Sequence, residues 1–280
     1  AMSTTLASAI GPFLGIYLNQ HASFYTILIL CIVILAVSYA TVFFLKPPMM
    51  EKAGKAEKSG SAPAVGRGLS IHNFIEIKAL PIAVIGAFVG FGYSSIVSFL
   101  SAYTEEIDLV TAGSFFFIVY SVAILVSRPV SGRLFDTKTE NHVMYPAFVL
   151  FSAGLFALGQ AHYGFIVLLS GGLIGLGFGT FLSSGQAIAI KMSPNHRVGL
   201  ATSTFLAITD AGVGIGPFVL GVLVPIVGFR GLFTGMAGLV IASIALYHFL
   251  HGRHVFRRHA LHTARERSMR SHLSPLEVED

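Results

Sequence analysis

Long apolar runs are the feature that most limits how this chain can fold. Eight of them, most about 18 to 25 residues long, are separated by short islands of charged residues. A helix of that length crosses roughly 30 Å of hydrocarbon. The approximate spans are 2–19, 23–45, 80–103, 111–131, 143–160, 164–190, 198–224 and 229–250. The sequence therefore predicts an all-α, polytopic membrane protein with about eight transmembrane helices.

Composition excludes several other classes of protein. The chain is 54% hydrophobic and 11% charged, whereas a soluble domain is about one quarter charged. A net charge of +5 could suggest nucleic acid, but the basic residues flank apolar spans and no polar domain presents them. The single cysteine, Cys31, excludes an intramolecular disulfide. We expect the lipid bilayer, and no nucleic acid, as a partner.

The loops differ in charge according to the side on which they are predicted to lie. Every Lys and Arg except Arg230 falls in one set of loops and in the tail, and the alternate set carries Glu105, Glu106 and Asp108. Because cytoplasmic loops are enriched in Lys and Arg, both termini and the long central loop are predicted to be cytoplasmic. The expected location is a cell membrane, plasma or inner, crossed several times.

The segment Ile-Gly-Pro-Phe occurs twice, at Ile10–Phe13 and at Ile215–Phe218. Residues 1–45 align without gaps on residues 206–250, with identical residues spread along the whole stretch. Internal duplication is a property of secondary transporters. The second copy begins six spans after the first, which indicates a six-helix repeat. We expect the chain to hold helices five to twelve of a twelve-helix protein.

This duplication gives a domain plan. The plan is 1–45, the last two helices of an amino-terminal half; 46–79, a cytoplasmic central loop; 80–250, a carboxyl-terminal six-helix half; and 251–280, a basic cytoplasmic tail. The tail is rich in histidine but lacks cysteine or an ordered acidic partner, so we expect it to lie on anionic lipid rather than to bind metal.

The stretch from Ser127 to Asp136 resembles the loop signature G-x-L-a-D of the major facilitator superfamily. The resemblance implies a gating role for Asp136, which would latch a neighbouring helix amino terminus, together with Arg128, Gly132 and Arg133. The alternatives are that Asp136 only caps the following span and that Arg128 only extends to the lipid headgroups.

Residues 7–15 resemble the antiporter motif g-x-x-x-G-P-x-x-G-G of exporters in that family, with Gly11 and Pro12 in register. The second copy places Gly216 and Pro217 at the equivalent positions. Proline kinks a helix and small residues let helices approach closely, which gives a seam where halves can bend and pack. Packing alone is the alternative explanation, and an export direction follows only from the resemblance.

Asp210 is the only acidic residue well inside an apolar span. A carboxylate at that depth is costly unless it is paired, hydrated or protonated, so it usually faces a cavity. We therefore expect Asp210 to carry a coupling proton or to contact substrate. The alternative is structural bonding to Thr209, Ser203 or the backbone near Gly212.

Polar residues on three other spans are candidates for the substrate cavity. In the family, the helices equivalent to spans 80–103 and 164–190 line the central cavity. The candidates are Tyr93, Ser94, Ser98, Tyr120 and Gln186. Each hydroxyl has the alternative of bonding to its own helix backbone.

The sequence carries no catalytic triad, paired carboxylates, nucleotide signature or metal-ligand spacing, so we expect neither an enzyme nor a bound cofactor or metal. The resemblance is to drug or metabolite exporters and implies proton-coupled export of a small organic solute by alternating access. Uptake of a metabolite and a truncated, non-transporting membrane scaffold remain as alternatives.

Overall fold

The computed structural model describes residues 15, 18, 23–44, 75–137, 139–194 and 197–252. Within these residues every regular element is helical, which confirms the predicted all-helical membrane class. The elements are α2 Phe24–Phe44, the 3-10 turn η2 Ile77–Ala79, α3 Leu80–Glu106, α4 Val110–Thr137, α5 Glu140–Gly159, α6 Gly164–Met192, α7 Val198–Tyr247 and the π-helical turn η4 His248–Gly252. Of these, α3 to α7 are long and apolar enough to cross a membrane.

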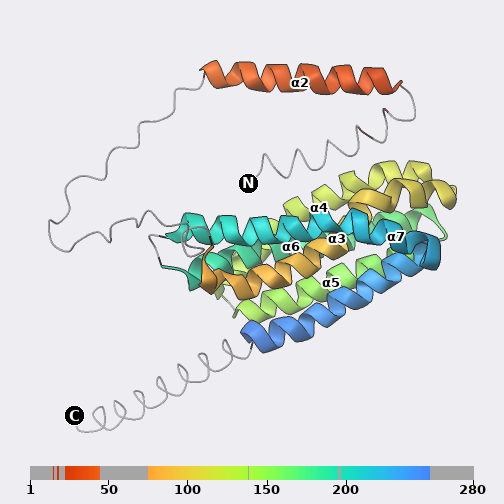
Figure 1. Cartoon of the computed structure of the whole chain (residues 1–280). Helices are drawn as coiled ribbons and strands as arrows, with labels where there is room; N and C mark the ends of the chain where they lie inside the picture. Colours follow the sequence, from red (N-terminus) through yellow and green to blue (C-terminus); the bar gives the residue numbers. More distant parts are fainter. Residues whose placement is uncertain are drawn as a thin grey trace, which may run out of the picture.

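Helix α7 contains two spans joined at Gly228. The apolar stretch Val198–Gly252 has 55 residues, which as one straight helix would measure about 80 Å, far more than a bilayer. Gly228 has φ 68° and ψ 170°, a backbone conformation that essentially only glycine adopts. Figure 1 shows the chain reversing its direction within α7. The break therefore falls between the predicted spans 198–224 and 229–250.

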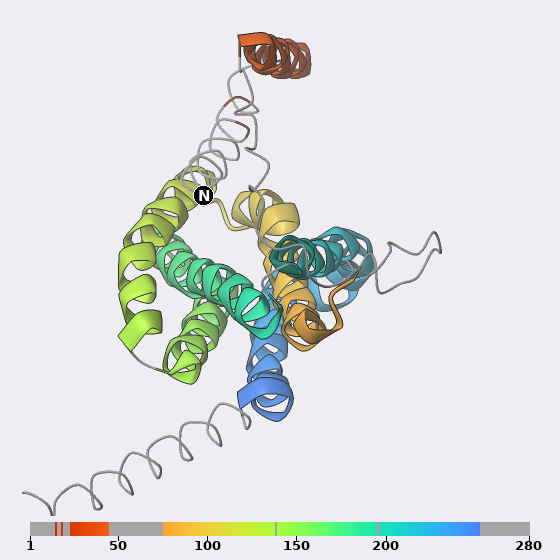
Figure 2. The same cartoon turned by 90° about the vertical axis from the view of Figure 1, so that its left-hand side faces the viewer.

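Helices α3 to α7 form one packed body. Helix α3 lies against α7, α4 against α6, and α5 against both α6 and α7 (Figures 1 and 2). The core between them is rich in aromatic side chains; the largest fully buried ones include Tyr103, Phe116, Phe148, Phe151 and Tyr247. Bulky side chains of this kind fill the space between helices and give the body its hydrophobic interior.

Helix α2 lies apart from this body in Figure 1. Four consecutive side chains, Ile32 to Leu35, are all more than half exposed, and four consecutive positions cover every side of a helix. A helix that is apolar all round belongs in lipid or in a protein interior. Its composition therefore agrees with the predicted span 23–45.

Candidate functional site

Helices α3 and α7 meet along two pairs of glycines. Gly86 and Gly90 lie one turn apart on α3, and Gly212 and Gly216 lie one turn apart on α7. A Cβ atom on Gly90 would lie 2.5 Å from the carbonyl oxygen of Thr209, and Gly212 is packed equally tightly against the backbone of α3. Small residues at this spacing let two backbones touch. We call the contact formed by these four glycines the glycine seam.

The second copy of the duplicated segment is divided between the glycine seam and the opposite surface. Gly216 is buried against the side chain of Ser94, while Pro217 is exposed inside α7. Ile215 and Phe218 are 57% and 82% exposed. Gly11 and Pro12 of the first copy lie outside the described residues.

Asp210 lies on the face of α7 that points away from α3. It is exposed, as are Ser203, Ala207 and Gly214, which share this face at helical spacing. Asp210 makes no hydrogen bond or ion pair with any described residue. Its neighbour Thr209 is buried and donates to its own helix backbone.

The two side chains that were alternative partners for Asp210 are already bonded elsewhere. The Thr209 hydroxyl donates to the Phe205 carbonyl at 2.8 Å, and the Ser203 hydroxyl donates to the Gly199 carbonyl at 2.8 Å. Asp210 therefore presents its carboxylate at a surface that the described helices leave uncovered.

Tyr93 and Tyr120 belong to an aromatic stack that joins three helices. The Tyr93 ring of α3 is stacked on Phe178 of α6, with centroids 4.1 Å apart. It also stacks on Tyr120 of α4 at 5.9 Å. Tyr120 and Phe178 are buried and Tyr93 is half-buried, so the stack connects the two helices that were expected to line a cavity.

The other cavity candidates differ in their surroundings. Ser94 is buried and its hydroxyl donates to the Phe91 carbonyl at 2.6 Å. Ser98 is exposed on α3, and Gln186 is half-buried on α6. Among these candidates, Ser98 and Gln186 are thus the more accessible ones.

The loop signature continues helix α4, which extends to Thr137. Pro129 lies inside this helix, where it removes one backbone hydrogen bond. Arg128 is half-buried and Gly132 is exposed. The side chains of Arg133 and Asp136 lie outside what the structure describes.

Two buried carboxylates at helix ends were missed by the sequence analysis. Glu76, 3% exposed, accepts a hydrogen bond from the Arg197 guanidinium at 2.9 Å and ties the segment before α3 to the start of α7. Glu140 pairs with Lys191 at 2.8 Å and with His251 at 2.7 Å. The available signal was an acidic residue shortly before an apolar span, as Glu76 and Glu140 are.

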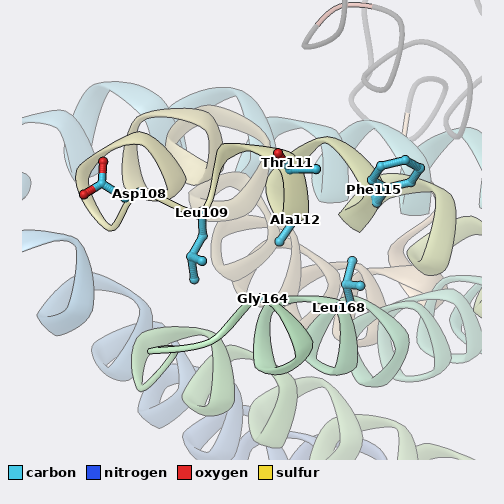
Figure 3. A pocket seen from close by; sticks show the side chains of 7 residues that line it. All are labelled: Asp108, Leu109, Thr111, Ala112, Phe115, Gly164 and Leu168. Carbon is cyan, nitrogen blue, oxygen red and sulfur yellow. The ribbon is translucent and has the colours of Figure 1, made fainter.

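A groove of about 380 Å³ lies at the opposite end of the body from Glu140. Figure 3 shows it between the start of α4 and the start of α6. Its lining residues are Asp108, Leu109, Thr111, Ala112, Phe115, Gly164 and Leu168. The lining is mainly apolar and includes none of the predicted site residues.

The described residues include no group of three or more His, Cys, Asp or Glu side chains that could hold a metal ion. Most of the tail histidines lie beyond the described residues. The candidate site thus consists of the face of α7 that carries Asp210, the aromatic stack around Tyr93 and the glycine seam.

Comparison with known proteins decides the family. The sequence model of the Major Facilitator Superfamily matches residues 1–169 and 82–276. The chain belongs to the major facilitator superfamily. Membership of this family accounts for the long apolar helices.

Several curated transport proteins are similar to the chain. A ribitol transporter of Klebsiella pneumoniae is 29% identical over 57% of this chain and 40% of its own length. The probable nitrate transporter NarT of Staphylococcus aureus is 27% identical over 62% of this chain and 44% of its own length. The inner membrane transport protein YdhP of Escherichia coli is 26% identical over 58% of this chain and 43% of its own length.

The matched region spans less than half the length of each of these relatives. No solved structure matches the chain. Membership of the family agrees with the multi-pass membrane class.

Proposed function

We propose that this major facilitator protein works as a secondary active transporter that exports a small organic solute or drug in exchange for protons, by alternating access. The observation that carries the proposal is the exposed Asp210 carboxylate, which is the only acidic side chain in α7. A membrane carboxylate of this kind usually faces a partner helix or a water-filled cavity, where it can take up and release a proton.

The predicted site residues receive distinct roles in this mechanism. Asp210 carries the coupling proton. The gate consists of Arg128, Gly132, Arg133 and Asp136, and the bending elements are Gly11, Pro12, Gly216 and Pro217. The substrate contacts are Tyr93, Ser94, Ser98, Tyr120 and Gln186. Support for the last set comes from the aromatic stack between α3, α4 and α6.

The domain plan and orientation are part of the same proposal. Residues 1–45 belong to the amino-terminal half and residues 80–250 form the carboxyl-terminal half, with both termini in the cytoplasm of a cell membrane. The uncovered face of α7 agrees with this plan, because a second half of the transporter would supply a surface to cover it.

Uptake of a polar metabolite is the second candidate function. It is favoured by the similarity to a transporter that is named for ribitol. Ribitol is a neutral polyol, and hydroxyl and amide groups such as those of the exposed Ser98 and the half-buried Gln186 suit a solute of this kind.

The test is transport by the protein in proteoliposomes under an imposed pH gradient, with radiolabelled ribitol and a cationic dye as probes. Export predicts that the dye moves against the direction of proton flow, and uptake predicts that ribitol moves with the protons. Absence of flux for both probes would favour the non-transporting scaffold.

Replacement of Asp210 by asparagine tests the coupling role. We expect Asp210→Asn to abolish flux driven by the pH gradient while exchange of unlabelled for labelled solute continues, because exchange needs no net proton movement. Asp108→Asn, which changes an exposed acid in the α3–α4 connection, is the matched control. Undiminished proton-driven flux in Asp210→Asn would remove this residue from coupling.

A further inference from the structure

A buried ionic cluster fastens the end of the last helix to two other helices. Glu140, at the start of α5, accepts hydrogen bonds from Lys191 Nζ at the end of α6 at 2.8 Å and from His251 Nε2 in the turn η4 at 2.7 Å. Glu140 and His251 are 8% and 6% exposed. Three elements that are distant in sequence therefore meet at one carboxylate.

The two cationic partners of Glu140 differ in their surroundings. The Lys191 side chain is 67% exposed, so water weakens its attraction to Glu140. His251 is buried beside the carboxylate, where an ion pair is screened much less. Lysine keeps its charge at any physiological pH, whereas histidine changes charge between about pH 5 and 8. The buried bond is thus the one whose charge-assisted form requires a proton on the imidazole.

Neutral hydrogen bonds hold the same turn independently of pH. Tyr247 donates to Asn141 Oδ1 at 2.9 Å, and Asn141 Nδ2 donates to the Gly252 carbonyl at 3.2 Å. Neither an amide nor a tyrosine hydroxyl changes charge near pH 7. These bonds keep the turn close to α5 when the ionic bond weakens.

The remaining groups around His251 leave Glu140 as its only charged partner among the described residues. The Tyr247 ring lies 5.6 Å from the His251 ring. His248, on the exposed side of the turn, lies 2.8 Å from the neutral Tyr145 hydroxyl. Helix α3 also packs against η4, but it carries no titratable side chain before Tyr93.

We propose that Glu140, Lys191 and His251 form a pH-responsive clamp, which is tight when His251 is protonated and looser when it is neutral. The protonated imidazole makes a charge-assisted hydrogen bond to the carboxylate, and such bonds are roughly twice as strong as neutral ones. The turn η4 is π-helical, a rare geometry that often marks functional sites. This inference is independent of any role of Asp210.

The clamp lies where pH can act on the transporter from the predicted cytoplasmic side. It joins α5, α6 and the second half of α7 at their ends on that side, and the basic segment that begins at Arg253 follows directly in the sequence. A rise in cytoplasmic pH would therefore loosen the end of the last described helix.

Hydrogen–deuterium exchange of the purified protein in detergent tests the clamp. After correction for the intrinsic effect of pH on exchange, we expect opening of residues 247–252 to be roughly five- to tenfold more frequent at pH 8 than at pH 6. Residues 147–158, in the middle of α5, are expected to show no such change. Equal corrected rates for residues 247–252 at the two pH values in the wild-type protein would overturn the proposal without any variant.

Two histidine variants assign the effect. His251→Gln keeps a hydrogen-bond donor but cannot be charged, so its opening rate should be the same at pH 6 and pH 8. His248→Gln is the matched control in the same turn, and it should retain the wild-type response. A full pH response in His251→Gln, or its loss in His248→Gln alone, would show that His251 does not operate the clamp.

Discussion

Replacement of Gly212 by alanine should separate α3 from α7. The new Cβ would contact the carbonyl oxygen of Ala87 and lie 2.8 and 2.9 Å from its carbonyl carbon and Cα, whereas carbon atoms pack at about 3.5–4.0 Å. All three atoms belong to the backbone, so no change of rotamer relieves the overlap. The two helices must move apart by about 1 Å, and a gap of that size forfeits a quarter to a half of the attraction between facing atoms.

The cost of this separation follows from measured effects of overpacking, about 1–3 kcal/mol. The matched control is Gly238→Ala, because Gly238 lies in the second half of α7 with nothing within 4 Å of its added Cβ. Both variants share the gain of about 0.5–1 kcal/mol that alanine brings to a helix. The free energy of unfolding of Gly212→Ala should therefore be about 1–3 kcal/mol below that of Gly238→Ala.

The assay is the midpoint of unfolding of both variants in detergent, with size-exclusion profiles to confirm that each is folded and monodisperse. Equal midpoints would refute the tight backbone contact. A second position in the glycine seam allows a rescue experiment. Gly216→Ala overlaps only with the Ser94 side chain, so adding Ser94→Gly to Gly216→Ala should restore the stability that Gly216→Ala loses. The coupling energy between the two substitutions should exceed about 0.5 kcal/mol.

Two further predictions concern the turn at Gly228 and the ion pair between Glu76 and Arg197. Gly228→Ala forces alanine into the φ 68° conformation and should lower the free energy of unfolding by about 1–3 kcal/mol. Its unfolding midpoint should lie below that of the control Gly221→Ala, whose added Cβ makes only an ordinary contact. Similar midpoints for the two variants would contradict the strained turn at Gly228. Arg197→Gln leaves the buried Glu76 without its charged partner and should lower the free energy of unfolding by about 1–3 kcal/mol. The double variant Glu76→Gln with Arg197→Gln should recover most of this loss. Equal instability of the single and double variants would show that loss of the ion pair does not cause the destabilisation.

The apolar runs alone were sufficient to predict the helical architecture. A span must be about 20 residues long and free of charge, and this rule located α2 to α6 within a few residues of their observed bounds. The hairpin within α7 was also predictable, because its apolar stretch is too long for one crossing and contains Pro225 and Gly228. These features depend on local sequence and on the thickness of the bilayer.

The tertiary partners of the site residues were not predictable in the same way. Sequence marked Gly216 as part of a motif, but only the packed body shows that it meets Ser94. Glu140 and His251 are 111 residues apart, and each by itself resembles an ordinary charge at the end of a span. Such pairs depend on which helix ends meet in space, and the apolar pattern does not specify that.

The two buried carboxylates lie at the same end of the body, because α3, α5 and α7 begin there and α6 ends there. Glu76 and Glu140 tie these helix ends together, and the glycine seam holds α3 and α7 along their length. In the proposed transporter, a half that is fixed in this way can rock as one unit, as alternating access requires. The face of α7 that carries Asp210 takes no part in these contacts. Substitutions on that face should therefore alter transport with little change in stability, and substitutions in the glycine seam should alter stability first.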